Sequence, residues 1–277
     1  MMNKGILYIC PTPIGNLEDI TLRTLRVLKE VDLIAAEDTR HTVKLLNHYE
    51  IKKPLISYHE HNKKIKGDLL IEKLKEGTNI GLVTDAGMPG ISDPGEDIIQ
   101  LAIENRVKVV ALPGATASIT ALVVSGLPTD KFVFEGFLPS KRKDRIKELK
   151  RLKIEYRTII LYEAPHRILN LLKDMEEILG NRQIAISREL TKIYEETFRG
   201  TIKEVLDKLE KERPRGEFVL VIKGKDRVEE DLYEDITIKE HIKFHMEEGL
   251  TKKDAVKKVA SLRNIPKNLV YKESLKI

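Results

Sequence analysis

Residues 81–95 read GLVTDAGMPGISDPG, and this stretch decides the fold. It begins inside the apolar run 80–83, which is typical of a buried strand in an α/β sheet. It continues as a loop in which Gly87, Gly90 and Gly95 alternate with two prolines. Glycine permits a positive φ and a close approach to the main chain, while proline restricts loop motion. The stretch therefore predicts a strand that ends in a shaped ligand loop.

Two carboxylates, Asp85 and Asp93, follow this strand. Open α/β sheets bind ligands at the carboxyl ends of their strands, so we interpret the loop as part of a ligand site. Asp93 itself we interpret as lying near the N-cap of the helix expected over 96–105, where an aspartate satisfies free backbone N–H groups.

Short apolar runs alternate with helical patterns through the first half, which indicates βαβ units and a largely parallel sheet. The expected strands are 5–10, 33–36, 54–58, 80–84 and 108–112. The expected helices are 22–31, 39–49, 69–76, 96–105 and 115–125. The first domain is predicted to span residues 1–117.

The second half has a different rhythm, which favours a second α/β domain, residues 118–225, with more antiparallel character. Its expected strands are 132–137, 158–162, 184–187, 196–200 and 218–222. Its expected helices are 145–153, 167–179 and 202–209.

A charged linker, 223–235, precedes a small basic helical domain predicted over residues 234–277. Its helices are expected at 238–247, from Thr251 onward with Asp254 three residues on, and at 267–275. Three short helices with a basic face resemble a helix-turn-helix nucleic-acid module. A stabilising or dimerising appendage is the alternative.

Composition bounds the class of protein. The 277 residues are 41% hydrophobic and 34% charged, as in soluble globular proteins. No apolar run approaches the roughly 18 residues of a spanning helix, and no secretory signal is recognisable, so we expect a cytoplasmic protein without a membrane partner. Cys10 is the sole cysteine, which excludes an internal disulfide. We expect it to be a buried structural thiol and predict no metal site.

The net charge of +5 is unevenly distributed. Residues 139–157 contain nine Lys or Arg against three acids, and residues 250–277 contain eight against two. Basic segments on an otherwise acidic chain suggest a polyanionic partner, because Lys and Arg neutralise phosphates. A solvated lysine-rich surface, common in heat-adapted proteins, is the alternative.

Five motifs can now be compared together. They are TPIGNLEDIT at 12–21, AAEDTR at 35–40, DAGMPGISDPG at 85–95, PGATA at 113–117 and YEAPHR at 162–167. In this order and spacing they resemble the ribosomal RNA small subunit methyltransferase I family, over essentially the whole chain. That family belongs to the tetrapyrrole-methylase-like enzymes that use S-adenosylmethionine.

The resemblance implies a fold of two α/β domains with the cofactor cleft between them, plus the small C-terminal helical domain. It implies 2′-O-methylation of a cytidine in the decoding region of small-subunit (16S) ribosomal RNA, and a homodimer. It also implies a set of cofactor contacts: Pro13, Ile14, Gly15, Asp85, Gly87, Met88, Ile91, Thr116, Ala117, Ser118, Tyr162 and Leu220. Neither GxGxxG nor GxxxxGK[ST] follows the first strand, so the fingerprints of nicotinamide and P-loop sites are absent.

Four residues are candidates for catalysis. Asp38 could accept the ribose proton and Arg40 could hold a phosphate, although an ion pair with N-capping of the next helix explains both equally well. Glu163 and His166 follow a strand of the second domain. The reference pKa of histidine suits a base, but a plain helix start also explains this segment.

With an RNA substrate, the basic segments are expected to grip the phosphate backbone. The predicted RNA contacts are Arg142, Lys143, Arg145, Lys147, Lys252 and Lys253. Two other functions remain open: a corrinoid or porphyrin methylase of the same fold, and a non-catalytic RNA-binding factor in ribosome assembly.

Overall fold

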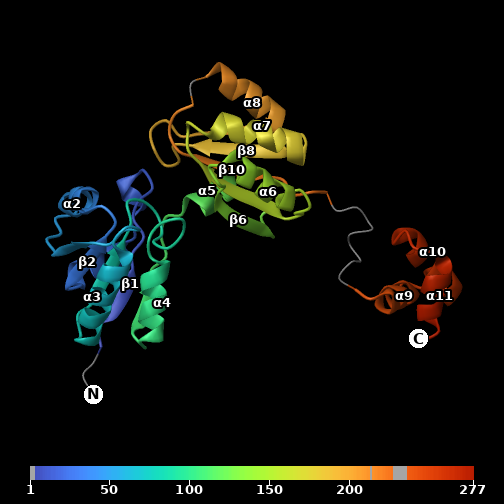
Figure 1. Cartoon of the computed structure of the whole chain (residues 1–277), viewed down its shortest axis with the longest axis horizontal. Helices are drawn as coiled ribbons and strands as arrows, with labels where there is room; N and C mark the ends of the chain where they lie inside the picture. The colour runs from blue at the N-terminus through green and yellow to red at the C-terminus, as the bar shows by residue number, and fades with distance from the viewer. Residues whose placement is uncertain (1–3, 213, 227–235) are drawn as a thin grey trace. The chain divides into compact units, whose positions relative to one another are not determined.

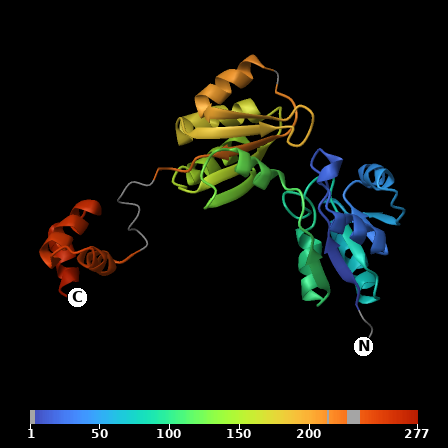
Figure 2. The ribbon, with the colours of Figure 1, turned by 180° about the vertical axis from the view of Figure 1, so that it is seen from behind.

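The structure, a computed structural model, describes residues 4–212, 214–226 and 236–277. Its internal contacts divide the chain into two compact units, residues 1–223 and 224–277 (Figures 1 and 2). The larger unit contains two five-stranded sheets, one from each half of its sequence. Within the described residues, no helix has both the length and the apolar composition needed to cross a membrane.

The first sheet is parallel throughout, with the strand order β3-β2-β4-β1-β5. Its strands are β1 (Ile6–Ile9), β2 (Leu33–Ala36), β3 (Leu55–Ser57), β4 (Ile80–Val83) and β5 (Lys108–Ala111). Because all five strands run in one direction, the loops that follow them leave from a single edge. The predicted ligand loop therefore lies beside the chain that follows β1, β2 and β5.

Helices cover both faces of this sheet. The helices are α1 (Leu22–Glu30), α2 (Thr39–His48), α3 (Lys63–Lys75) and α4 (Glu96–Glu104), with a short 3-10 turn, η1 (Leu17–Asp19), before α1. Alternating residues of β1 point to opposite faces: Leu7 packs with α3 and α4, while Cys10, just after the strand, packs with α1. Cys10 is fully buried, as predicted, and burial raises the pKa of its thiol to about 12.

The second sheet is mostly antiparallel, as predicted, with the order β6-β7-β10-β8-β9. Its strands are β6 (Phe132–Phe137), β7 (Thr158–Glu163), β8 (Gln183–Arg188), β9 (Glu196–Thr201) and β10 (Phe218–Ile222). The parallel pair is β6 with β7. Helices α6 (Arg142–Leu152), α7 (Ile168–Leu179) and α8 (Ile202–Lys211) pack on one face, and α5 (Ala117–Val124) packs on the other (Figure 1).

Two helices begin earlier than the sequence predicts. Helix α3 begins at Lys63 rather than at residue 69, and α6 begins at Arg142 rather than at residue 145. Both first turns are rich in lysine and arginine and carry no side-chain N-cap hydrogen bond. Such turns lack the apolar spacing by which a helix start is recognised, and the side chain of Asn62, the N-cap residue of α3, binds His59 and Ser57 instead of the helix.

The smaller unit is a three-helix module formed by α9 (Ile238–Glu247), α10 (Lys252–Leu262) and α11 (Lys267–Ser274). Thr251 caps α10 by accepting a hydrogen bond from the N–H of Asp254, as the sequence predicts. A small core of Ile242, Val256, Val259 and neighbouring residues holds the helices together. Most of the predicted linker, and the first two residues of the predicted tail domain, lie outside the described residues.

A chain of polar contacts runs through the core of this module. Arg263 Nε donates to His241 Nδ1 at 3.0 Å, the two Nε2 atoms of His241 and His245 are 3.1 Å apart, and His245 Nδ1 is 2.7 Å from Glu248. Because His241 Nδ1 accepts a hydrogen bond, the ring hydrogen of His241 lies on Nε2 and is donated to His245 Nε2. His245 then carries its ring hydrogen on Nδ1 and donates it to the Glu248 carboxylate. Burial and the positive charge of Arg263 lower the pKa of His241 to about 4.

Candidate active site

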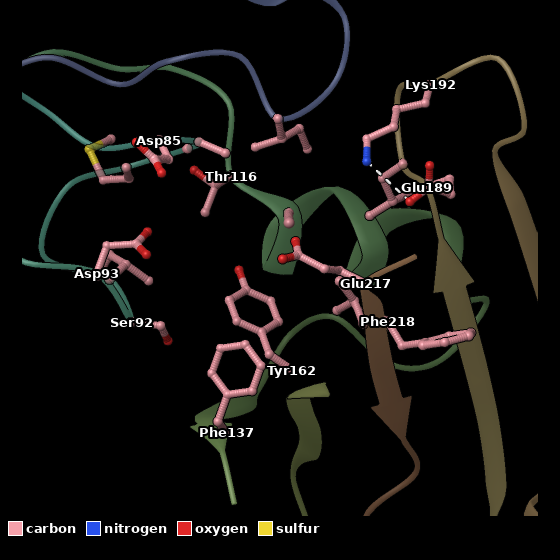
Figure 3. Close-up of a pocket in the computed structure, with 18 of the residues that line it drawn as sticks. Asp85, Ser92, Asp93, Thr116, Phe137, Tyr162, Glu189, Lys192, Glu217 and Phe218 are labelled. Carbon is pink, nitrogen blue, oxygen red and sulfur yellow. Dashed lines mark hydrogen bonds and ion pairs between the residues drawn. The ribbon is translucent and has the colours of Figure 1, made fainter. Parts of the chain in front are cut away.

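A cavity of about 320 Å³ lies within the larger unit, between the loops of the first sheet and the strand ends of the second (Figure 3). The first half supplies lining residues from the loops after β1, β2, β4 and β5, and the second half supplies them from β6, β7, β10 and the β8–β9 turn. The volume falls in the range of roughly 300–1,000 Å³ of small-molecule sites.

The ligand loop is tied to the chain after β1. Thr12 and Gly87 exchange backbone hydrogen bonds, with N···O distances of 2.9 and 3.0 Å, and the Thr12 hydroxyl donates to the Thr84 carbonyl at 3.1 Å. Gly87 has φ of +78°, and a Cβ there would lie 3.4 Å from a methyl group of Ile14. The contact with Ile14 would be an ordinary one, so it is the positive φ that favours glycine at this position.

The cavity brings together most of the predicted cofactor contacts. Eight of them line it: Ile14, Asp85, Gly87, Met88, Ile91, Thr116, Ala117 and Tyr162. Pro13 adjoins Ile14, and Gly15 lies against the β8–β9 turn, where a Cβ would come within 2.8 Å of the Leu190 carbonyl oxygen. The backbone N–H of Ser118 donates to the Tyr162 hydroxyl at 3.0 Å, which holds the start of α5 against β7.

Leu220 does not line the cavity. Its side chain is fully buried in the core beneath α7 and α8. Phe218, on the same face of β10, and Val219, on the opposite face, border the cavity because they lie at the beginning of the strand, whereas Leu220 lies further along it.

The cavity wall is strongly acidic. Five carboxylates line it, Glu37, Asp85, Asp93, Glu189 and Glu217, against one cation, Lys192, whose ammonium group is 3.1 Å from a Glu189 oxygen. Figure 3 shows Asp85 and Asp93 on one side of the cavity and Glu189, Glu217 and Lys192 on the other. The site is therefore suited to a cationic ligand.

Asp93 is not a helix cap, contrary to the expectation from sequence. Gly95 occupies the N-cap position of α4, and no side chain caps that helix. Asp93 instead borders the cavity, where burial and the negative charges of Glu37, Glu217 and Asp85 raise its pKa to about 7. Burial also raises the pKa of Glu37.

Asp38 and Arg40 form a closed pair outside the cavity. Asp38 caps α2 by accepting from the N–H of Arg40 at 2.8 Å, and the Arg40 guanidinium binds the same carboxylate at 3.1 and 2.7 Å. These hydrogen bonds hold the pKa of Asp38 far below its usual range, so the carboxylate is a poor proton acceptor. The geometry matches the ion-pair and capping alternative, and the preceding residue, Glu37, reaches the cavity instead.

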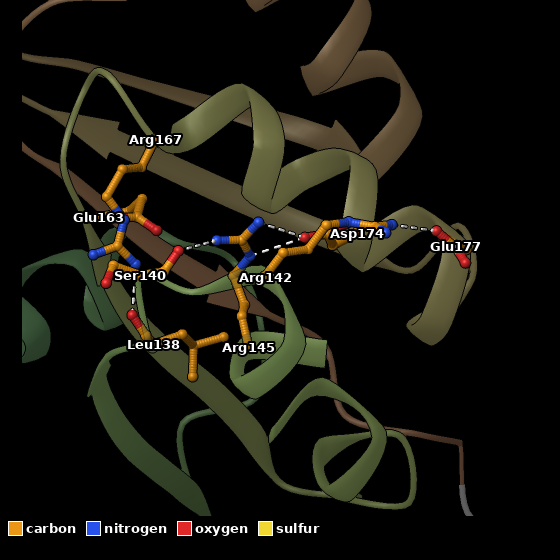
Figure 4. Close-up of polar contacts among 8 residues, drawn as sticks. All are labelled: Leu138, Ser140, Arg142, Arg145, Glu163, Arg167, Asp174 and Glu177. Carbon is orange, nitrogen blue, oxygen red and sulfur yellow. Dashed lines mark hydrogen bonds and ion pairs between the residues drawn. The ribbon is translucent and has the colours of Figure 1, made fainter. Parts of the chain in front are cut away.

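Glu163 and His166 also lie outside the cavity lining. The Glu163 side chain is buried, 3.0 Å from Arg167 Nε, and burial raises its pKa. Arg167 donates to the carbonyl of Leu138, directly after Phe137, which lines the cavity. His166 is exposed at the turn before α7. The YEAPHR segment thus braces the end of β6 (Figure 4).

Arg145 is buried, which corrects its prediction as an exposed RNA contact. Its guanidinium binds the buried Asp174 at 2.8 and 2.7 Å and the Ser140 carbonyl at 3.2 Å (Figure 4). Arg142 is exposed but also pairs with Asp174 and with Glu177. The other predicted RNA contacts are exposed: Lys143 and Lys147 on α6, and Lys252 and Lys253 on α10.

Several cavity residues were missed from sequence. Phe137, Glu189, Lys192 and Glu217 come from the second half, at strand ends or turns without a distinctive motif. Their one common signal is position: each lies at or near one end of a predicted strand.

The family model described as Tetrapyrrole (Corrin/Porphyrin) Methylases matches residues 6–206. Curated relatives named "Ribosomal RNA small subunit methyltransferase I" match nearly the whole chain. The Bacillus subtilis protein is 53% identical over 97% of this chain and 94% of its own length, and the Synechocystis protein is 46% identical over 99% and 98%. The Thermotoga maritima protein is 49% identical over 80% of this chain and 100% of its own length.

Solved structures share the fold at low sequence identity. A diphthine synthase aligns with a TM-score of 0.62 at 15% identity, over 81% of this chain and 92% of its own. The uroporphyrin-III-C-methyltransferase from Thermus thermophilus aligns with a TM-score of 0.57 at 19% identity, over 79% and 94%. The chain therefore belongs to the tetrapyrrole (corrin/porphyrin) methylase family and, within it, to the ribosomal RNA small subunit methyltransferases I.

Proposed function

We propose that this protein transfers the methyl group of S-adenosylmethionine to the 2′-hydroxyl of a cytidine in the decoding region of small-subunit (16S) ribosomal RNA. One observation carries the proposal: motifs scattered over the chain surround a single acidic cavity, in a protein whose curated relatives share the methyltransferase name along its length. When bound, the cofactor supplies an electrophilic methyl group on a cationic sulfur.

The residues of the cavity fit such a cofactor. Ile14, Met88 and Ile91 give an apolar surface for a soft sulfonium cation, and the surplus of carboxylates attracts its positive charges. Thr116 and Ala117 open α5, where backbone N–H groups without helical partners can bind polar edges of a ligand. Tyr162 holds this helix start in place through Ser118.

We assign Asp93 the role of general base. A ribose hydroxyl is a weak nucleophile until its proton is removed, and a base with a pKa near the working pH removes it most effectively. The carboxylate of Asp93 lines the cavity and has a pKa of about 7. Asp38 is held as a carboxylate by Arg40 instead, and Glu163 is enclosed behind the cavity wall.

Contacts to the RNA backbone are assigned to exposed lysines, Lys143 and Lys147 on α6 with Lys252 and Lys253 on α10. Phosphate contacts position a substrate but do not specify its sequence, so we expect the shape of the small ribosomal subunit to select the nucleotide.

We also propose a homodimer in the cytoplasm. Ile119 and Val123, 44% and 71% exposed and one turn apart on α5, supply an apolar face for it.

The proposal is tested by incubating the protein with labelled S-adenosylmethionine and unmodified small ribosomal subunits, followed by mass mapping of the methylated nucleotides. One 2′-O-methylated cytidine in the decoding region is expected. Label on a tetrapyrrole precursor but none on RNA would instead identify a tetrapyrrole methylase. Calorimetry that detected no binding of S-adenosylmethionine would leave a non-catalytic RNA-binding factor.

A further inference from the structure

The turn that joins β8 to β9 displays two apolar side chains beside the cavity. Ile193 is 93% exposed and Tyr194 is 82% exposed. Three neighbours in the same turn, Glu189, Leu190 and Lys192, line the cavity. The exposed pair therefore belongs to the same turn as three residues of the cavity wall.

This turn is held in one conformation by its own hydrogen bonds. The backbone N–H of Thr191 donates to the Glu195 carboxylate at 2.6 Å. The backbone N–H of Lys192 donates to the Glu189 carbonyl at 3.0 Å, and the backbone N–H of Glu195 donates to the Lys192 carbonyl at 3.1 Å. Glu189 and Thr191 adopt left-handed φ values of 52° and 65°. Residues hold such strained conformations only where the surroundings fix them, and such positions cluster at functional sites.

The turn is also fixed to the first half of the unit. The N–H of Asn16 donates to the Thr191 hydroxyl at 3.0 Å. Gly15 packs so closely that a Cβ there would lie 2.5 Å from the Lys192 side chain. Ile193 and Tyr194 are thus presented to solvent by a rigid turn, so their exposure does not result from a loose loop.

We propose that Tyr194, flanked by Ile193, is a stacking surface for an unpaired nucleobase of the RNA substrate. The proposal rests on the proposed function and names the recognition element of the same site. Proteins read RNA mainly through unpaired bases, which stack on aromatic side chains. A ribose whose hydroxyl enters the cavity brings its own base or a neighbouring one close to the cavity wall, and Tyr194 is exposed two residues beyond Lys192 of that wall.

The test compares Tyr194→Ala and Tyr194→Phe in the full-length protein, with unmodified small ribosomal subunits as substrate. Stacking on an aromatic side chain contributes about 1–3 kcal/mol per base, so Tyr194→Ala should lower kcat/KM for the subunits by about 5- to 150-fold. Tyr194→Phe keeps the ring and should retain kcat/KM within about twofold. The Kd of S-adenosylmethionine, measured by calorimetry, should be unchanged in both variants.

A matched control is Ile65→Ala, which removes a side chain that is 80% exposed on α3 and is not among the cavity residues. It should leave kcat/KM unchanged, whereas Ile193→Ala should lower it. Wild-type kcat/KM in Tyr194→Ala would overturn the stacking assignment while leaving the methyltransferase function intact. A lower sedimentation coefficient in Tyr194→Ala would overturn it in favour of a second copy of the chain on this turn. An inactive wild-type protein would count against the proposed function itself.

Discussion

At the scale of single residues, Asp93 is the group whose chemistry changes most with its surroundings. A carboxylate with a pKa of about 7 gains the ability to accept a proton near neutral pH. We expect kcat/KM for the cofactor to rise with pH up to about 7 and then to level off, because the base acts only when deprotonated. Asp93→Asn should lower kcat by about 10²–10⁴-fold and abolish this rise.

The matched control for Asp93 is Asp38→Asn. Asparagine also caps helices, so this variant should keep α2 and the pH profile of the wild type. The profiles are measured by initial rates of methyl transfer between pH 5 and 9. If Asp93→Asn kept the wild-type profile and Asp38→Asn lost it, the assignment of the base would be reversed.

At the scale of elements, helix α6 has two basic faces with different roles. Arg145 faces the core and is bound to the buried Asp174, whereas Lys143 and Lys147 face solvent. Arg145→Ala leaves Asp174 with Arg142 alone, and breaking a buried ion pair typically costs about 3–5 kcal/mol. We expect urea unfolding of Arg145→Ala to give a free energy of unfolding lower by up to about that amount.

The paired variant Lys143→Ala/Lys147→Ala should unfold as the wild type does. Its affinity for RNA should fall, and the slope of log K against log salt concentration should become shallower, because two phosphate contacts are lost. Filter binding across salt concentrations measures the slope. An unchanged slope in the lysine variant would remove α6 from the RNA-binding surface.

The three-helix module has a buried histidine, His241, whose neutral form is favoured in its core. The folded pKa of His241 is about 4, below the ordinary value of 6.5, so the unfolded module binds more protons between these values. Its free energy of unfolding should therefore fall as pH drops from about 6.5 to about 4, by up to about 3 kcal/mol. Hydrogen exchange of α9 and α10, corrected for intrinsic rates, measures this loss, and exchange in β4 should serve as the unchanged reference.

The helices and strands could be predicted from the sequence more completely than the residues of the cavity. The buried strands could be predicted within a residue or two, because an apolar run such as Ile80–Val83 is visible without any tertiary information. The glycines and prolines of the 85–95 loop likewise marked the ligand loop. Glu37 and Glu217 could not be assigned to one cavity, because their approach depends on how the two sheets pack. Arg145 was misplaced for a related reason: a basic pattern does not reveal a buried partner such as Asp174.

At the scale of the whole molecule, the net positive charge equals that of the three-helix module. Residues 236–277 contain ten Lys or Arg against five Asp or Glu, and the other 235 residues contain 39 of each. The Thermotoga maritima relative matches 80% of this chain with its entire length. A relative with that name is thus matched in full by about four fifths of this chain, and we expect the module to add an electrostatic contribution to RNA binding.

Removal of residues 224–277 should separate these roles. We expect the shortened protein to bind S-adenosylmethionine with an unchanged Kd, because every residue of the cavity lies in the larger unit. At 0.15 M salt the KM of the shortened protein for small subunits should exceed that of the full chain. At low salt the two KM values should converge, because weak phosphate contacts then suffice. Loss of cofactor binding on truncation would contradict the assignment of cofactor binding to the larger unit alone.

The surplus of carboxylates around the cavity has a consequence for turnover. With the cofactor in the cavity as we propose, Asp85, Asp93 and Glu217 would attract its sulfonium, whereas the sulfur that remains after methyl transfer is an uncharged thioether. We therefore expect Coulombic attraction to favour the methylated cofactor over the spent one. The protein should consequently suffer little inhibition from accumulated S-adenosylhomocysteine, an advantage for an enzyme that must keep pace with ribosome production.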